Sequence, residues 1–125
     1  DAKHIAIWGL AFKPDTDDIR NSPAIKLVEL LARDGAKVSA HDPQALARAR
    51  HAHPGPTYHD DLYDAVRGAE AVVICTEWEE YRQADLARLR SLMVTPILFD
   101  GRNLFEPAAV RAAGFRYFGV GRTSA

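Results

Sequence analysis

The sequence predicts an α/β domain with a doubly wound, mostly parallel sheet and helices on both faces of that sheet. Five short apolar runs carry the first part of this prediction, because continuous rather than alternating runs are typical of strands covered on both sides. The segments between the runs carry helix start and stop signals, and strands that alternate with helices form right-handed βαβ units. The 125 residues suit a single domain, so we expect one unit over residues 1–125.

The predicted strands follow from the apolar runs, and the predicted helices from their capping residues. The strands are expected at Ile5–Gly9, Lys37–His41, Ala71–Cys75, Pro96–Phe99 and Phe115–Phe118. Ser22-Pro23 starts the first helix as an N-cap followed by proline, and Gly35 ends it. Further helices are expected at Gln44–Arg50 behind Asp42-Pro43, between Asp60 and Gly68, and at Pro107–Ala113 before Gly114. The Pro/Gly-containing loop of residues 52–59 is expected to be the most exposed connection.

Composition and charge exclude several classes of protein. Hydrophobic residues make up 47% and charged residues 26%, as in ordinary globular proteins. The net charge of -1 disfavours nucleic-acid or anionic-membrane binding, and no apolar run nears the ~18 residues of a spanning helix. One cysteine cannot form an internal disulfide, so a reducing, cytoplasmic setting fits best. The sole methionine is Met93, so we expect a processed chain or part of a longer protein.

Ligands of doubly wound sheets bind beyond the carboxyl ends of the strands, so the loops after the strands hold the candidate chemistry. The loop after the first strand contains only Gly9 and is not a G-x-G-x-x-G fingerprint. About a dozen residues separate it from the next helix, so a side chain rather than a helix N-terminus must reach a phosphate. Lys13 is the candidate, against a solvated surface lysine. Arg102, after Gly101, is a candidate bidentate phosphate ligand, against an ion pair with Asp100 or a neighbouring acid.

Other polar residues have competing interpretations. The carboxylates of Asp15, Asp17 and Asp18 could hold Mg²⁺, but compensation of a helix N-terminus and pairing with Arg20 are favoured. A phosphoacceptor receiver domain would need an aspartate at the end of the third strand, where Cys75 and Thr76 stand. Asp42 occupies the place of a ribose-binding acid, although Pro43 after it favours a capping role.

The cysteine, histidine and aromatic residues are expected to serve structure rather than chemistry. Cys75 ends an apolar run with no neighbouring base in sequence, so we expect a small buried residue and no nucleophile. Trp78 and Tyr81, three residues apart, are expected to pack in the core or an interface. The loop histidines form a poor metal signal; they are His51, His53 and His59.

Taken together, the loops resemble the UDP-glucose 6-dehydrogenases of the UDP-glucose/GDP-mannose dehydrogenase family, specifically their C-terminal UDP-binding domain. The resemblance runs from about Ile5 to Arg122 in the family's order. It rests on Gly9-Leu10-Ala11-Phe12-Lys13-Pro14-Asp15-Thr16-Asp17-Asp18-Ile19-Arg20, Ser22-Pro23-Ala24, Thr76-Glu77-Trp78, Asp100-Gly101-Arg102-Asn103, Gly114-Phe115-Arg116-Tyr117 and Gly119-Val120-Gly121-Arg122.

The resemblance implies a Rossmann-like fold and the oxidation of UDP-glucose to UDP-glucuronate by two NAD⁺ and a catalytic cysteine. It implies that Phe12, Lys13 and Arg102 bind the substrate and that Arg20 reaches the NAD cofactor held by another domain. The family's glycine fingerprint, its Gly-Gly-x-Cys segment and its dimer-forming connector are absent from these residues. The implied partners are therefore a missing N-terminal NAD-binding domain and further copies in a homodimer or higher homo-oligomer.

Three alternatives stay open at this point. Sister families that act on GDP-mannose or on UDP-N-acetylhexosamines have similar loops. A noncatalytic α/β nucleotide-binding or regulatory module would also lack a nucleophile and a fingerprint. A complete small NAD(P)-dependent reductase is disfavoured because no glycine-rich phosphate loop is present.

Overall fold

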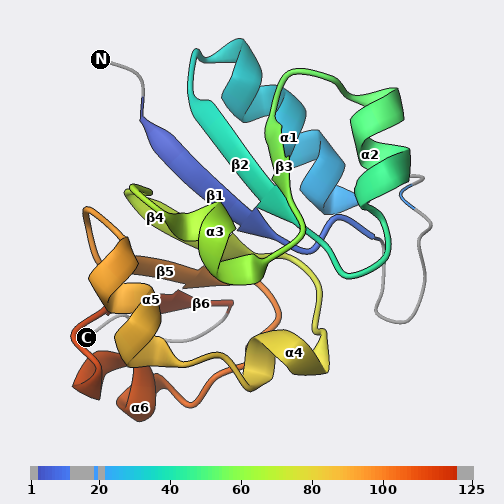
Figure 1. Ribbon diagram of the computed structural model, residues 1–125. Coiled ribbons are helices and arrows are strands. Elements are labelled where there is room, and N and C mark those ends of the chain that lie inside the picture. Colours follow the sequence, from blue (N-terminus) through green and yellow to red (C-terminus); the bar gives the residue numbers. More distant parts are fainter. Residues whose placement is uncertain (1–2, 12–18, 20–21, 121–125) are drawn as a thin grey trace.

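The computed structural model describes residues 3–11, 19 and 22–120, and these form one six-stranded parallel sheet flanked by helices (Figure 1). The strand order is β3-β2-β1-β4-β5-β6, the order of a dinucleotide-binding doubly wound fold. The predicted Rossmann-like α/β fold is therefore confirmed. The strands are β1 (His4–Trp8), β2 (Lys37–His41), β3 (Thr57–His59), β4 (Ala71–Ile74), β5 (Ile97–Asp100) and β6 (Arg116–Gly119).

Six helices are described, and they lie on both faces of the sheet. They are α1 (Pro23–Arg33), α2 (Leu46–Ala52), α3 (Leu62–Val66), α4 (Glu79–Arg82), α5 (Leu86–Leu92) and α6 (Pro107–Ala112). α1 and α2 cover β1 to β3 from behind in Figure 1, whereas α3, α5 and α6 lie on the other face. No described helix has the length and apolar character needed to cross a membrane.

Alternation along β1 divides the apolar residues into two cores. Ile7 packs with Ile25 and Val28 of α1, whereas Trp8 packs with residues of α3 and α5. All of these side chains are at least 90% buried, which makes both faces of the central strands part of the folding free energy. The helices begin where the sequence supplies caps: the Ser22 hydroxyl accepts from the N–H of Ala24, and Pro23 follows it.

The structure corrects the predicted elements in two places. β3 lies inside the segment predicted to be an exposed loop, because the three residues Thr57–His59 pair with β2 and need no apolar run to do so. α4 and α5 lie in a stretch for which no helix was predicted, although the Asp85 carboxylate caps α5 by accepting from Arg88 N–H.

The expectation of continuous apolar strands is wrong for β2. Lys37, Ser39 and His41 alternate with Val38 and Ala40, and only the latter two pack in the core under α1. The opposite face of β2 is polar but covered: Ser39 and His41 are only 3% and 1% exposed.

Candidate functional site

The carboxyl ends of the strands bring the predicted loops to one edge of the sheet, here called the strand-end site. Its described parts are residues 9–11 after β1, Asp42 after β2, residues 75–77 after β4 and residues 100–103 after β5. Phe12, Lys13 and Arg20 lie outside the described residues, as do Asp15, Asp17 and Asp18. Arg102 is the predicted ligand-binding residue that the structure describes.

Asp42 is a buried carboxylate that accepts four backbone hydrogen bonds. One oxygen accepts from the N–H groups of Leu10 at 2.8 Å and Ala11 at 3.1 Å, and the other from Gln44 and Ala45, both at 2.8 Å. A carboxylate has about four acceptor positions, so no position of Asp42 is left for a ribose hydroxyl. Asp42 has the predicted capping bonds, because it accepts from the N–H groups two and three positions on, although these belong to the turn of residues 43–45 and α2 itself begins at Leu46.

A second contact fixes the loop after β1 against the loop after β4. The Thr76 hydroxyl, fully buried, donates to the carbonyl of Ala11 at 2.9 Å. Gly9 has φ +97° and lies so close to Thr76 that an added Cβ would stand 2.6 Å from the Cβ of Thr76. Only glycine fits this position, since both the backbone angle and the contact exclude a side chain. The backbone that leads into Phe12 and Lys13 therefore leaves the sheet in a fixed direction.

Arg102 extends over the ends of β4 and β5. Gly101 lets the turn approach the sheet closely: its N–H donates to the carbonyl of Ile74 at 2.9 Å, where a Cβ would stand only 2.7 Å from that oxygen. The Arg102 guanidinium donates to the Glu77 carboxylate at 3.2 Å. Both side chains are about 40% exposed, so the pair is worth only ~0.2–1 kcal/mol and yields readily to a ligand of higher charge. The ion pair with a neighbouring acid is thus present, with Glu77 as the acid.

The side chain of Asp100 stabilises the turn that carries Arg102. Its buried carboxylate accepts from the Arg102 N–H at 3.3 Å, from the Phe105 N–H at 2.8 Å and from the Tyr117 hydroxyl at 3.0 Å. Asn103, with φ +52°, donates its side-chain amide to the carbonyl of Val120. These contacts position the turn rigidly, which lowers the entropic cost of ordering Arg102 around a ligand.

Cys75 does not have the properties of a nucleophile. The side chain is partly buried, and burial raises the pKa of its thiol to about 12, although the nearby Arg102 acts in the opposite direction. A nucleophilic cysteine needs a pKa lowered toward neutrality, because the thiolate is the reactive form. We therefore assign Cys75 a structural role.

Sequence reasoning did not single out a buried network beside the strand-end site. The His41 ring lies 2.9 Å from the Tyr81 hydroxyl, which also donates to the His41 carbonyl, and Tyr81 stacks on Trp8 with ring centroids 4.8 Å apart. Burial lowers the pKa of His41, although Asp42 opposes this shift, so the ring is neutral at pH 7. The predicted core packing of Trp78 and Tyr81 is confirmed. Within the described residues, no group of three His, Cys, Asp or Glu side chains could hold a metal ion.

Comparison with known proteins matches the chain to a described protein family. The profile of the "UDP-glucose/GDP-mannose dehydrogenase family, UDP binding domain" matches residues 6–107. The UDP-glucose 6-dehydrogenase of Pseudomonas aeruginosa is 48% identical over 127 aligned positions, which cover 97% of this chain but 28% of that protein. The chain therefore spans little more than a quarter of the length of this curated relative.

Solved structures show the same relationship in three dimensions. A UDP-glucose dehydrogenase from Pyrobaculum islandicum has a TM-score of 0.80 and 33% identity, covering 98% of this chain and 26% of that one. An NDP-N-acetyl-D-galactosaminuronic acid dehydrogenase from Methanosarcina mazei has a TM-score of 0.86 and 32% identity, covering 99% of this chain and 26% of that one.

Proposed function

The chain belongs to the UDP-glucose/GDP-mannose dehydrogenase family as its UDP-binding C-terminal domain, and we propose that it holds the UDP moiety of UDP-glucose for a longer NAD-dependent UDP-glucose 6-dehydrogenase. In this proposal residues 1–125 form the C-terminal domain of that enzyme. The remainder of the protein supplies the NAD site and the catalytic cysteine, and the complete protein is a homodimer or a higher homo-oligomer.

The position of Arg102 is the observation that carries the proposal. Its guanidinium lies at the strand-end site, where doubly wound folds bind nucleotides, and its partner Glu77 is an exposed carboxylate that a diphosphate can replace. Asp42 and Thr76 both hydrogen-bond to the backbone of Ala11, at the same edge of the sheet as Arg102. They fix the chain just before Phe12 and Lys13. We assign Phe12, Lys13 and Arg102 to the UDP-sugar. These residues bind and orient the substrate, so that binding energy remote from the reacting carbon positions the sugar.

The residues of this domain do not fit NAD. The first βα connection has Gly9 but no glycine fingerprint, and α1 begins only at Pro23. The carboxylate at the ribose-binding position, Asp42, is already saturated by backbone N–H groups. We therefore place NAD on a part of the protein outside these residues, with Arg20 reaching toward it. This domain alone is then inactive as a dehydrogenase.

UDP-glucose is proposed over related nucleotide sugars because three curated relatives that are 43–48% identical to this chain are all named UDP-glucose 6-dehydrogenases. A second possibility is a noncatalytic nucleotide-binding module, which would bind nucleotides without a preference for uracil over guanine.

A calorimetric titration of this chain with UDP, UDP-glucose, GDP and NAD tests the proposal. We expect UDP and UDP-glucose to bind and NAD to give no heat of binding, with GDP weaker by roughly tenfold or more, equivalent to about 1.4 kcal/mol. Equal binding of UDP and GDP would indicate the generic module, and binding of NAD in preference to UDP would overturn the assignment. Formation of NADH from UDP-glucose by the chain alone would contradict the proposed division of labour.

A further inference from the structure

A polar surface occupies the α3 side of strands β1 to β3. Because side chains alternate, Ser39 of β2 faces away from the α1 core in which Val38 and Ala40 are buried. Ser39 is opposite Thr57 of β3 in the strand register, and both point to the α3 side, as His4 and His59 do. Strands of a parallel sheet are ordinarily apolar on both faces, so a row of polar side chains across three of them is a candidate binding surface.

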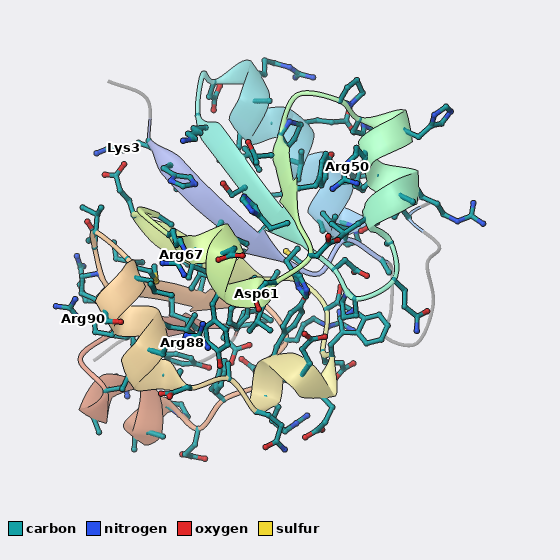
Figure 2. All side chains as sticks on the ribbon, in the orientation of Figure 1. Lys3, Arg50, Asp61, Arg67, Arg88 and Arg90 are labelled. Carbon is teal, nitrogen blue, oxygen red and sulfur yellow. The ribbon has the colours of Figure 1, made fainter. Side chains whose placement is uncertain are left out.

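These polar residues line a cavity of about 290 Å³, here called the α3 groove. His4, Ser39 and His59 of the strands form the floor of the groove. Lys37, the first residue of β2, also lines it. α3 contributes one wall through Asp64 and Arg67, and Figure 2 shows Arg67 beside α3 on the viewer's side of the sheet. The volume is about ten times that of one water and close to the lower limit of small-molecule sites, about 300 Å³.

Positive charge predominates in the α3 groove. Asp64 is its carboxylate among the described lining residues, and Arg67 satisfies that carboxylate with its Nε–H at 3.0 Å, which leaves the other guanidinium N–H groups available to a ligand. No described carboxylate forms an ion pair with Lys37. Burial lowers the pKa of His4, and the Lys37 and His59 charges lower it further. The groove therefore has two permanent cations, Lys37 and Arg67, and one described carboxylate, Asp64, to balance them.

The floor of the groove can also donate hydrogen bonds. The His4 ring is held between the Ser39 hydroxyl, 2.7 Å from its Nε2, and the backbone of Gly68. Glu70 lies beside the strand end, where it accepts from the His4 backbone N–H at 3.1 Å and pairs with Lys3 at 3.4 Å. When the ring is protonated, Nε2 donates to the Ser39 oxygen, which leaves the hydroxyl hydrogen of Ser39 free to donate to a ligand.

We propose that the α3 groove binds the phosphate group of a small phosphorylated metabolite or inorganic phosphate. Lys37 offers a compact charge, Arg67 a planar set of donors, and Ser39 a hydroxyl, a combination suited to phosphate oxygens. His4, Lys37 and Thr57 are the first residues of their strands, so the groove opens near the strand ends opposite to Arg102. The inference therefore goes beyond the proposed nucleotide site and does not depend on it.

The histidines give the groove a signature that a nonspecific surface contact lacks. A bound dianion favours the protonated imidazole, so phosphate raises the pKa of His4, and binding tightens as the pH falls. The test follows all histidine ring signals of this chain by NMR in a pH titration, in phosphate and in chloride at equal ionic strength. We expect the apparent pKa of His4 to be higher in phosphate than in chloride. The exposed His51 of α2 serves as the internal control and stays unchanged.

Variants and a second probe identify the ligand contacts. Lys37→Ala and Arg67→Ala each weaken phosphate binding roughly tenfold, the effect of one lost charged contact, whereas Lys26→Ala on α1 leaves it unchanged. Tighter binding of a hexose 1-phosphate than of inorganic phosphate identifies a phosphate ester, and equal binding identifies the free anion. Equal responses of the His51 and His4 ring signals to phosphate, or wild-type binding in Lys37→Ala, would overturn the proposal. Circular dichroism of each variant checks that a loss of binding does not come from unfolding.

Discussion

The Asp42 carboxylate at the end of β2 accepts a 2.8 Å hydrogen bond from the backbone N–H of Leu10, which follows β1. The two residues are 32 positions apart in sequence, and the carboxylate is fully buried. Because the same oxygen also accepts from Ala11, this one side chain sets the direction in which the loop after β1 leaves the sheet. The loop that carries the proposed substrate-binding residues thus depends on a carboxylate whose own hydrogen bonds all go to backbone N–H groups.

Asp42→Asn should lower the free energy of unfolding by about 2–3 kcal/mol, because an amide NH₂ would face backbone donors in place of a charged acceptor. Urea denaturation measures this loss. Asp34→Asn, at the exposed end of α1, is the matched control and should change stability by less than about 0.5 kcal/mol. Similar stability of the two variants would show that the Asp42 contacts contribute little.

Gly9→Ala should destabilise the fold more than Gly35→Ala. Both glycines have positive φ, at +97° and +85°, so both substitutions carry backbone strain. A Cβ at Gly9 would also stand 2.6 Å from the Cβ of Thr76, whereas Gly35 has open space around it. Thermal melts therefore compare backbone strain alone, in Gly35→Ala, with strain plus a steric clash, in Gly9→Ala. A higher melting temperature for Gly9→Ala than for Gly35→Ala would contradict the close approach of Gly9 to Thr76.

Alkylation of Cys75 by iodoacetamide should be about a thousandfold slower in the folded chain than in the urea-unfolded chain at pH 8. The physical reason is the difference between a thiol pKa of about 12 in the fold and the ordinary pKa of 9.0 in the unfolded chain, since only the thiolate reacts. The folded rate should rise about tenfold for each pH increase of one between pH 8 and 10. Equal rates in the folded and unfolded chains would identify an exposed thiol.

The free energy of unfolding should fall as the pH decreases below 6.5. Burial holds the pKa of His41 below its ordinary 6.5, so the unfolded chain takes up a proton first and acid favours unfolding. His4, whose pKa is also lowered by burial, acts in the same direction.

Urea denaturation between pH 5 and 7 measures this dependence, and its slope should be smaller in His41→Asn than in the wild type. His51→Asn, at an exposed position, should keep the wild-type slope. An unchanged slope in His41→Asn would show that its ring is protonated equally well in both states.

The sequence predicted the parallel sheet because strand and helix signals are local. Ser22-Pro23 caps its own helix, and the apolar run of β4 needs no information from elsewhere. α5 also had a usable signal: Asp85 caps the helix and Leu89 three positions beyond Leu86 faces the core. β3 had none, because three residues next to prolines become a strand only through pairing with β2.

The candidate site was predictable in place but not in contacts. The loops after the strands follow from the fold, and Arg102 lies where they converge. For Asp42 only the local bonds to Gln44 and Ala45 could be expected from the sequence, whereas Leu10 and Ala11 are brought to it by strand pairing. Thr76 and Tyr81 acquire their roles in the same way, through partners 40 or more positions away.

Arg20→Ala should leave the binding of UDP-glucose to this chain nearly unchanged, because its proposed partner is NAD on another part of the protein. Lys13→Ala should weaken that binding roughly 10- to 150-fold, the loss of one charged hydrogen bond of about 1.5–3 kcal/mol. Calorimetric titration of the two variants compares them directly. A large loss only in Arg20→Ala would move the substrate site to that residue.

Titration of UDP-glucose into Arg102→Ala, Arg102→Lys and Glu77→Gln tests the strand-end site most directly. Arg102→Ala should weaken binding roughly 10- to 150-fold, and Arg102→Lys should restore little of it, since an ammonium cannot make a bidentate contact. Glu77→Gln should bind at least as tightly as the wild type, because it removes the carboxylate that competes for the guanidinium. Wild-type affinity in the folded Arg102→Ala variant would contradict the assignment of this edge to the nucleotide sugar.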